Sequence, residues 1–501
     1  MSEIDHAVSM NLAIAFEQST QRHSQSPALF WGETEFSYQM VQERVCIAAS
    51  ALQNLFQVKE GDRVAVWLRN CPEFASVALG ILWVGGVLVP VNNFLKPEEV
   101  LHILNDADID VLVAEEATRD QWVRLLPRRP TLRVLTIEEL AVLPRVNSAA
   151  NASRSAQDLA VIIYTSGTTG RSKGAMLTHA NLLSNVESCR QVLRALDTDR
   201  FIVLLPLFHS FMLTVGLLLP LMVGGSILLV RSLHPAKNIL QEIMLRGGTI
   251  LPAIPQFFRT LAAAGVPPGF PVRLCISGAA PLPGEILREF TEKVAGIPLL
   301  EGYGLSEASP VVSINPIQGP WKPGSIGVPI PEVEVSVQDD EGRILGPGAT
   351  GEICVRGPNV MLGYWNQPEE TAKTLVDGWL RTGDIGHGDT DGYFYITDRK
   401  KDMLLVNGIN VYPREIEELI YQYPGVKEAA VVGLQDPRKG EMPVAFVVAK
   451  EGTTLDERAV VAFLRDKLAD YKVPRKVVYL SALPRNATGK VLKGELRQTP
   501  H

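Results

Sequence analysis

The stretch Tyr164-Thr-Ser-Gly-Thr-Thr-Gly-Arg-Ser-Lys-Gly174 is the most distinctive segment of the chain. It follows the apolar residues 159–163, which predict a buried strand, and precedes a stretch from Met176 that we interpret as a helix. Glycine lets the backbone approach a ligand closely, and hydroxyl and N–H groups donate to phosphate oxygens. We therefore expect an anion cradle here, with Lys173 as a mobile positive charge.

Two other interpretations of this segment are weaker. A Walker A loop needs Gly-Lys-Ser/Thr in succession, whereas Lys173 is followed by Gly174. A flexible Ser/Gly linker seldom lies directly between a buried strand and a helix. The segment therefore predicts a phosphate-binding loop of another kind.

Composition restricts the class of protein. The 501 residues predict two to four domains, and 46% hydrophobic with 21% charged residues is typical of a soluble globular protein. A net charge of −7 without a basic run argues against a nucleic-acid partner. The five scattered cysteines, with no CxxC pair, predict reduced thiols and no zinc site. No signal peptide is recognised at the N-terminus, so we expect a cytoplasmic protein.

Residues 211–230 carry no charge and have the length of a membrane helix. Pro220 and the pair Gly224-Gly225 interrupt this run, and residues 226–230 look like a strand. We therefore predict a buried helix, a turn and a strand, and a peripheral membrane contact stays open.

The order of predicted elements indicates an α/β fold. Strands and helices alternate from residue 11 to 114, which predicts doubly wound parallel sheets, and residues 126–157 are interpreted as an irregular surface connection. Short strands between Gly and Asp turns predict a small β-rich subdomain over about residues 320–398. We expect a large N-terminal domain, residues 1–399, followed by a small mobile α+β domain, residues 400–501.

Later segments, together with the opening loop, resemble one family. They are Pro206-Leu-Phe-His209, Glu301-Gly-Tyr-Gly-Leu-Ser-Glu307, Gly351-Glu-Ile-Cys-Val-Arg-Gly357, Asp377-Gly-Trp-Leu-Arg-Thr-Gly-Asp384, Asp398-Arg-Lys-Lys-Asp402 and Pro484-Arg-Asn-Ala-Thr-Gly-Lys490. The set resembles the adenylate-forming superfamily of acyl-CoA synthetases, adenylation domains and luciferases. Within it, the chain looks most like the medium- and long-chain fatty acid CoA ligases.

The resemblance implies a reaction in two halves. A fatty acid carboxylate attacks the α-phosphate of ATP, giving acyl-adenylate and pyrophosphate. The thiol of coenzyme A then attacks the acyl carbon and releases AMP. The implied cofactors are ATP, Mg²⁺ and coenzyme A, and cations and donors placed around the reacting oxygens should carry most of the catalysis.

The resemblance also assigns the phosphate and nucleoside contacts. Glu307 resembles the carboxylate that binds Mg²⁺, and Ser306 keeps a hydroxyl where threonine is more usual. Asp384 resembles the ribose acceptor, with Arg399 beside it, and the Tyr303 ring resembles the one that stacks on adenine. The remaining residues of this kind are Thr165, Ser166, Gly167, Thr168, Thr169 and Lys173 for the β- and γ-phosphates, and Gly278, Ala279, Ala280, Glu301, Gly302 and Gly304 for the nucleotide.

The C-terminal motifs imply catalytic roles for two lysines. Lys490 resembles the residue that bridges the carboxylate and the α-phosphate, and Lys401 matches the hinge about which the C-terminal domain swings. Gly408 resembles a residue that lines the pantetheine tunnel. Asn407 and Leu405 depart from the lysines found there in some aryl-CoA ligases, which leaves the coenzyme A contacts open.

The acyl site is predicted from an apolar group. His209 alone would be interpreted as a core residue, but its motif resembles the gate beside the acyl carboxylate. Phe211, Val215, Pro310 and Val311 are expected to line the acyl tunnel, and they offer no charged partner for an amino acid. His179 is expected to serve helix packing.

Several alternatives stay open at this point. An aryl-CoA ligase of the 4-coumarate type and an enzyme that acylates a carrier protein are the nearest rivals. A non-catalytic nucleotide-binding relative is disfavoured by the presence of Lys490, Glu307, Asp384 and Arg399. The preferred chain length is not predicted, and a homodimer is a working expectation.

Overall fold

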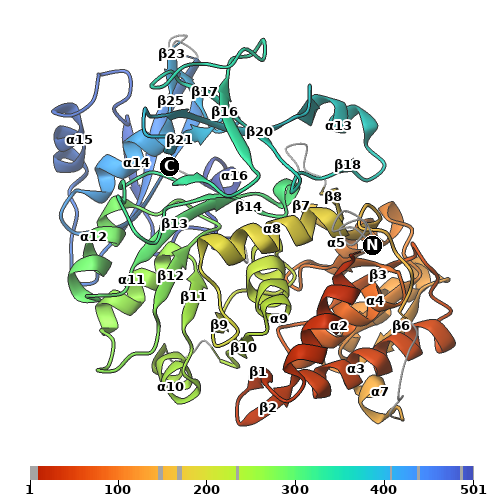
Figure 1. Ribbon diagram of the computed structural model, residues 1–501. Helices are drawn as coiled ribbons and strands as arrows, with labels where there is room; N and C mark the ends of the chain where they lie inside the picture. The colour runs from red at the N-terminus through yellow and green to blue at the C-terminus, as the bar shows by residue number, and fades with distance from the viewer. Residues whose placement is uncertain are drawn as a thin grey trace.

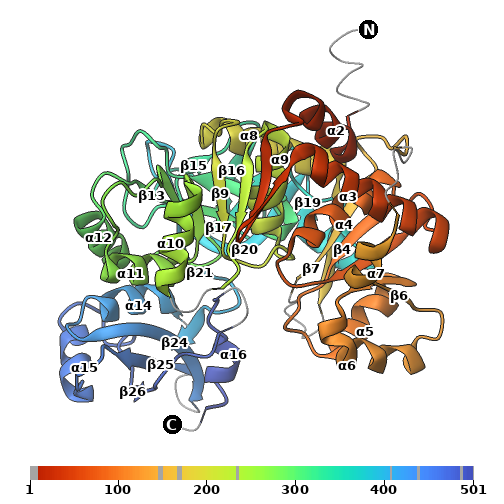
Figure 2. The same cartoon turned by 90° about the horizontal axis from the view of Figure 1, so that it is seen from below.

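The computed structural model describes residues 10–144, 151–165, 172–232, 236–406, 409–436, 440–485 and 489–499. A large N-terminal domain carries two α/β sheets and a β-rich subdomain, and a small α+β domain follows at its side (Figures 1 and 2). This arrangement confirms the predicted fold class.

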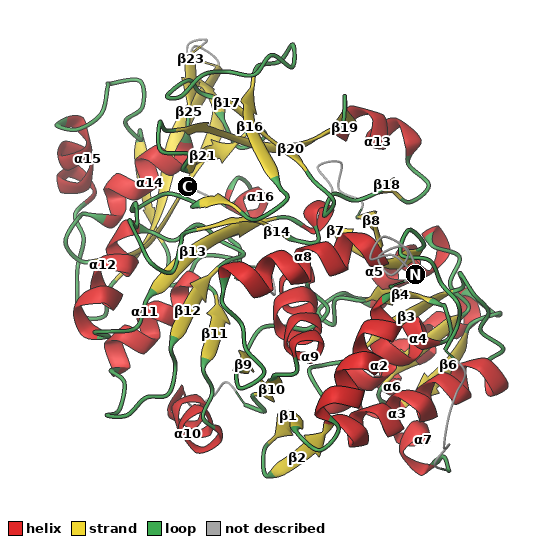
Figure 3. Cartoon of the chain, in the orientation of Figure 1, coloured by secondary structure: helices red, strands yellow, loops and turns green. Residues whose placement is uncertain are grey.

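The first α/β sheet has seven strands in the order β18-β8-β7-β4-β3-β5-β6. Strands β7, β4, β3, β5 and β6 run parallel, and β8 and β18 are antiparallel to their neighbours. Helices pack on this sheet (Figure 3), and its inner strands are buried on both faces, which explains their nearly continuous apolar sequences. The bounds are β3 Arg63–Trp67, β4 Val87–Pro90, β5 Val111–Ala114, β6 Arg133–Thr136, β7 Leu159–Thr165, β8 Lys173–Thr178 and β18 Gly363–Tyr364, with α4 Pro72–Trp83, α5 Pro97–Asp106, α6 Arg119–Trp122 and α7 Ile137–Val142.

The second sheet has nine strands in the order β15-β14-β13-β12-β11-β9-β10-β1-β2. One hydrophobic core extends between the two sheets, so the N-terminal domain packs as a unit. The strands are β1 Pro27–Trp31, β2 Thr34–Ser37, β9 Arg200–Val203, β10 Ser226–Leu229, β11 Ile250–Ala253, β12 Leu274–Ser277, β13 Leu299–Gly304, β14 Val311–Ile314 and β15 Val328–Pro329. The helices are α2 Leu12–His23, α3 Tyr38–Ser50, α8 His179–Val192, η4 Met212–Leu218, α9 Leu219–Val223, α10 Ala236–Arg246, α11 Pro255–Ala264, α12 Gly284–Lys293 and η5 Ser306–Ala308.

The element after the Ser-, Thr- and Gly-rich segment 164–174 differs from the prediction. Residues from Met176 were expected to begin a helix, but β8 pairs there with β7, with Tyr164 opposite Gly174. The helix α8 begins at His179, because the Thr178 hydroxyl accepts the N–H of Asn181 and caps it. The segment therefore connects two antiparallel strands, and its residues 166–171 lie outside the described residues.

The prediction of an irregular connection over residues 126–157 was also partly wrong. It contains β6, which pairs parallel with β5, and α7, which opens with a capping box between Thr136 and Glu139. The apolar run at 211–230 folds as predicted into η4, α9 and β10. None of the helices in the described parts of the chain is long and apolar enough to cross a membrane.

One expectation for these regions, the packing role of His179, is confirmed. His179 serves packing, because its Nδ1 accepts the N–H of Leu12 at the start of α2. All five cysteines are free.

The β-rich subdomain and the C-terminal domain are formed by separate sheets. The first comprises β16 Glu334–Gln338, β17 Gly351–Arg356, β19 Leu375–Val376, β20 Trp379–Gly388 and β21 Phe394–Arg399, with α13 Pro368–Thr374 beside it. The second comprises β22 Leu404–Val406, β23 Ile409–Val411, β24 Val426–Asp436, β25 Gly440–Ala449 and β26 Lys476–Tyr479, with α14 Pro413–Tyr421, α15 Glu457–Arg465 and α16 Lys493–Leu496.

The C-terminal domain contacts the N-terminal domain at α11, α12 and β13 (Figure 2). The Arg259 guanidinium donates to the carbonyl of Lys427. Arg414 Nη2 lies 3.9 Å from Glu301 Oε1, and Glu301 is buried directly before Gly302 and Tyr303. These contacts place the end of the chain, with Lys490, against the strand ends of the second sheet.

Candidate active site

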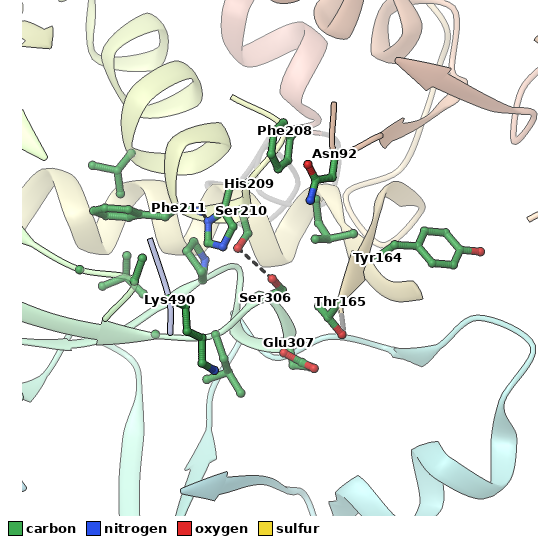
Figure 4. Close-up of a pocket in the computed structure, with 18 of the residues that line it drawn as sticks. Asn92, Tyr164, Thr165, Phe208, His209, Ser210, Phe211, Ser306, Glu307 and Lys490 are labelled. Atoms are coloured by element: carbon green, nitrogen blue, oxygen red, sulfur yellow. Dashed lines mark hydrogen bonds between the residues drawn. The ribbon is translucent and has the colours of Figure 1, made fainter. Parts of the chain in front are cut away.

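A cavity of about 860 Å³ lies between the ends of strands from both N-terminal sheets and the C-terminal domain (Figure 4). Its size is that of a pocket for a nucleotide-sized ligand. Most residues predicted from the sequence line it: Thr165, His209, Phe211, Val215, Gly278, Ala279, Gly302, Tyr303, Gly304, Ser306, Glu307, Pro310, Val311, Arg399, Lys401 and Lys490.

Four predicted residues do not belong to the cavity wall. Asp384 is covered by its own partners, Lys173 is turned to a carboxylate on α13, and Glu301 is buried toward the C-terminal domain. Ala280 follows Ala279, which lines the cavity with a left-handed backbone (φ 65°), and is not itself among the lining residues. Ser166, Gly167, Thr168, Thr169 and Gly408 lie outside the described residues.

Lys490 is the cation that the C-terminal domain brings to the site. Its side chain lines the cavity, as do those of Ser306 and Glu307 (Figure 4). Desolvation by the surrounding protein lowers the pKa of Lys490 to about 8, and the positive charges of Arg399 and Lys401 act in the same direction. The ammonium is therefore still charged at neutral pH.

His209 is a neutral imidazole at this site. Burial lowers the pKa of His209 to about 4, and Lys490 contributes to the shift. Its Nδ1 accepts the backbone N–H of Phe211 at 3.3 Å. Because Nδ1 accepts, the ring hydrogen is on Nε2, and His209 can donate one hydrogen bond without carrying charge.

Ser306 and Glu307 lie on η5, directly after the Gly302-Tyr303-Gly304 end of β13. The Ser306 and Ser210 hydroxyls are 2.9 Å apart, which joins this motif to the one that carries His209. Glu307 Oε1 accepts the hydroxyl hydrogen of Tyr364 at 2.8 Å.

The carboxylate of Glu307 fits a hard cation. Among the described residues, no three His, Cys, Asp or Glu side chains converge as a metal cluster. Glu307 would thus supply one oxygen ligand to a Mg²⁺ ion, and phosphate oxygens would supply others.

Two glycines at the cavity wall allow neighbouring parts of the protein to pack closely. A Cβ on Gly304 would lie 2.2 Å from the carbonyl oxygen of Pro310, so only glycine fits there. A Cβ on Gly278 would lie 3.1 Å from the Phe211 ring. The hydroxyl of Ser277 is fully buried at the cavity wall and has no hydrogen-bond partner among the described residues. The Ser277 hydroxyl could therefore pair with a polar group of a bound ligand.

Asp384 is engaged by two side chains. Its Oδ1 lies 2.6 Å from Arg399 Nε, and its Oδ2 accepts the hydroxyl of Tyr303 at 2.6 Å. Only 2% of the residue is exposed. The predicted ribose contact would therefore require Arg399 or Tyr303 to share the carboxylate with the ligand.

Lys173 is held away from the cavity. Its Nζ lies 2.5 Å from Glu370 Oε2 on α13 and 5.3 Å from the centre of the Tyr364 ring. The Glu370 carboxyl has its pKa lowered to about 2 by the hydrogen bond from Lys173 and then by that from Lys373. The predicted phosphate contact of Lys173 would require it to leave this partner.

Sequence reasoning missed several residues of the site. Asn92 and Phe208 line the cavity, and Asn92 follows β4 at the carboxyl edge of the parallel sheet, where ligands bind in such folds. That edge rule could have identified Asn92. Tyr364 and Glu370 reach Glu307 and Lys173 only through tertiary pairing, and no local pattern marks them.

Comparison with known proteins agrees with this geometry. Residues 16–365 match the AMP-binding enzyme family, and residues 415–490 match the AMP-binding enzyme C-terminal domain. The long-chain-fatty-acid–CoA ligase of Bacillus subtilis (strain 168) is 35% identical over 93% of this chain and 90% of that protein. The feruloyl-CoA synthase of an Amycolatopsis species is 36% identical over 93% of this chain and 94% of that protein.

A solved structure is similar over nearly the whole chain. ATP-bound MatB from Rhodopseudomonas palustris has a TM-score of 0.90 at 35% identity, covering 98% of this chain and 99% of that one. Apo MatB, at the same identity and coverage, has a TM-score of 0.78, so the overall structure described here is more similar to the ATP-bound form of MatB than to its apo form. Both the site and these relatives lead to one conclusion: the chain belongs to the AMP-binding enzyme family and is an adenylate-forming CoA ligase.

Proposed function

We propose that this ligase activates a fatty acid to its acyl-adenylate and transfers the acyl group to coenzyme A. The observation that carries the proposal is the apolar end of the cavity. The lining residues at this end lie on or next to α8, η4, β12 and β14. Helix α8 contacts both η4 and β14. The apolar residues are Cys189, Val192, Leu193, Phe211, Val215, Ile276, Pro310, Val311 and Ile314.

This apolar end supports a hydrocarbon substrate. The apolar group contains no charged side chain; the charged residues of the described wall, such as Glu307, Arg399 and Lys490, are separate from it. An amino acid would bury its ammonium group there without a partner, which costs several kcal/mol. The Bacillus subtilis relative acts on long-chain fatty acids by its name, which favours the same class of substrate here.

In the first half-reaction, we assign charge stabilisation to Lys490 and carboxylate alignment to His209. The Lys490 ammonium would lie between the substrate carboxylate and the α-phosphate, where two anions must approach each other. Neutral His209 would donate its Nε2–H to a carboxylate oxygen without adding charge. Mg²⁺ bound to ATP supplies charge neutralisation at the phosphates. Glu307 would hold it, Ser306 would lie by the α-phosphate, and Thr165 and Lys173 would contact the outer phosphates.

The nucleoside would be held by the second sheet. Gly278 and Gly302 lie at the ends of neighbouring strands, β12 and β13, and would flank the base, with Tyr303 stacked on it. Asp384 and Arg399 would bind the ribose.

For the second half-reaction we place the domain boundary between Arg399 and Lys400. β21 ends at Arg399 in one sheet, and β22 begins at Leu404 in another. Lys401 lies in the short connection between them and would be the hinge.

A panel of acids tests the proposed substrate class. Short-chain, long-chain, aromatic and amino acids are each incubated with ATP, Mg²⁺ and coenzyme A, and CoA-dependent AMP formation is measured. We expect the highest kcat/KM with a fatty acid. A preference for a hydroxycinnamate would instead indicate an aryl-CoA ligase, and release of pyrophosphate without transfer to coenzyme A would indicate another acceptor.

A matched pair of variants tests the acyl end directly. Leu193 is buried at the end of α8 and lines the cavity, whereas Leu196 is 57% exposed three residues later. Leu193→Trp should lower kcat/KM for long-chain acids more than for short ones, and Leu196→Trp should leave both unchanged. An equal effect of Leu193→Trp on every acid would argue against an acyl tunnel at this end.

A further inference from the structure

We propose that Tyr364 is a positioning residue that fixes the metal-binding carboxylate Glu307 relative to the phosphate-loop lysine Lys173. The inference deepens the proposed function, since it rests on MgATP binding at this site, but it does not depend on which acid is activated. Tyr364 lies on the short strand β18, 57 residues beyond Glu307, and is buried.

The hydroxyl of Tyr364 orients Glu307. It donates to Oε1 of the carboxylate at 2.8 Å. A carboxylate with one oxygen held in this way has its plane and its second oxygen restricted. Partners of this kind around a metal-ligating carboxylate tune metal affinity, because they keep the ligand in the geometry that the ion requires.

The ring of the same tyrosine supports Lys173. The Lys173 ammonium lies 5.3 Å from the ring centre and also forms a salt bridge with Glu370. An aromatic face attracts a cation at this distance, more strongly where water is excluded, and Lys173 is 9% exposed. Tyr364 therefore contacts both charged groups, one through its hydroxyl and one through its ring.

The backbone around Tyr364 holds the same two regions. The N–H of Met361 donates to the carbonyl of Glu307 at 2.9 Å. The N–H groups of Leu362 and Trp365 donate to the carbonyls of Met176 and Gly174 on β8, at 2.9 and 2.8 Å. Residues 361–365 thus bridge η5 and the strand that leaves the phosphate-binding segment. Movement of Lys173 and orientation of Glu307 are linked through this bridge.

The linkage predicts separable effects of the two parts of the side chain. Tyr364→Phe removes the hydroxyl and keeps the ring, so it should weaken the response to Mg²⁺ and leave binding of metal-free ATP unchanged. Tyr364→Leu removes both. Because the ring contacts Lys173 in the position turned away from the cavity, its loss should free this lysine and strengthen binding of metal-free ATP. Tyr393→Phe is the matched control, because its hydroxyl donates to the Pro320 carbonyl in the β-rich subdomain and does not line the cavity.

Calorimetric titration of the full-length protein with ATP, with and without Mg²⁺ and in the absence of any acid, measures the two affinities. The gain in affinity that Mg²⁺ gives should fall about tenfold in Tyr364→Phe, the lower end for loss of such a partner. The Mg²⁺ concentration for half-maximal pyrophosphate release should rise by a similar factor, and excess Mg²⁺ should restore the rate. In a Glu307→Gln background, Tyr364→Phe should add nothing.

The proposal is overturned if Tyr364→Phe, folded as judged by an unchanged melting temperature, keeps the wild-type gain from Mg²⁺. It is also overturned if Tyr393→Phe changes that gain equally, because the effect would then be general. Failure of the proposed function has a different signature: the wild-type protein would bind MgATP normally and activate none of the fatty acids.

Discussion

Replacement of Lys490 tests whether the C-terminal domain supplies the charge for adenylation. Lys490→Ala removes a cation that lines the same cavity as Ser306 and Glu307. Loss of one donor that stabilises developing charge lowers kcat by about 10²- to 10³-fold. We therefore expect acid-dependent pyrophosphate release to fall by at least about 10²-fold. Thioester formation from supplied acyl-adenylate should be spared.

The pKa of Lys490 adds a second, independent signature. Surrounding protein lowers the pKa of this ammonium to about 8 from its ordinary value of 10.5. The active form is the protonated one, so kcat/KM for adenylation should decline as pH rises through about 8. The charged fraction is about 90% at pH 7 and about 10% at pH 9 for such a pKa. Lys490→Arg stays charged throughout this range, so any activity it retains should lack the alkaline decline.

Half-reaction assays over pH 6.5 to 9.5 test whether Lys490 provides the charge for adenylation. Pyrophosphate release measures the first half, and acyl-CoA formation from synthetic acyl-adenylate measures the second. The reasoning would be refuted by equal losses in both halves for Lys490→Ala. It would also be refuted by an alkaline decline that persists unchanged in Lys490→Arg, since another group would then be responsible.

Three further substitutions test other parts of the site. Lys401→Pro should impair thioester formation more than adenylate formation, and unchanged overall turnover would count against a hinge there. Burial raises the pKa of Glu301 to about 7, so the stability contributed by its protonated form is present below about pH 4.5 and is lost as pH rises through 7. In Glu301→Gln this pH-dependent loss of stability, up to about 3 kcal/mol, should be absent when the free energy of unfolding is measured at pH 5 and 8. Equal pH dependence of the variant and the wild-type protein would contradict this expectation. Asp384→Asn should weaken AMP binding about tenfold by calorimetry, because a charge-assisted hydrogen bond is lost, whereas an unchanged Kd would exclude it from the ribose site.

The sequence predicted the fold class and many residues of the cavity wall because those residues cluster in short motifs at strand ends. Gly302, Tyr303, Ser306 and Glu307 are contiguous or nearly so, and one turn of chain brings them to the site. The helix expected from Met176 failed for a general reason. A short apolar run has no period long enough to separate strand from helix, and only the pairing with β7 decides it.

The unpredicted parts of the site depend on contacts between distant segments. Lys173 and Glu370 are 197 residues apart, and nothing near either residue marks them as partners. Asp384 was expected to face a ribose, yet Tyr303 and Arg399 occupy its oxygens. Motifs thus identified which residues gather at the site, but not how their side chains pair with one another.

Two ion pairs between the C-terminal and N-terminal domains, which help to keep Lys490 in the cavity, are weak. Lys450 lies 3.5 Å from Glu289 with its side chain 47% exposed, and such a surface pair contributes about 0–1 kcal/mol. The buried pair of Arg414 and Glu301 is loose at 3.9 Å, and the raised pKa of Glu301 indicates that the guanidinium does not compensate for burial of the carboxylate. A ligand present at 100 times its Kd contributes about 2.7 kcal/mol to the state that binds it. The buried Arg259 guanidinium, which donates to the Lys427 carbonyl, is a further contact of this interface. We therefore expect nucleotide binding to favour the arrangement in which Lys490 lies in the site.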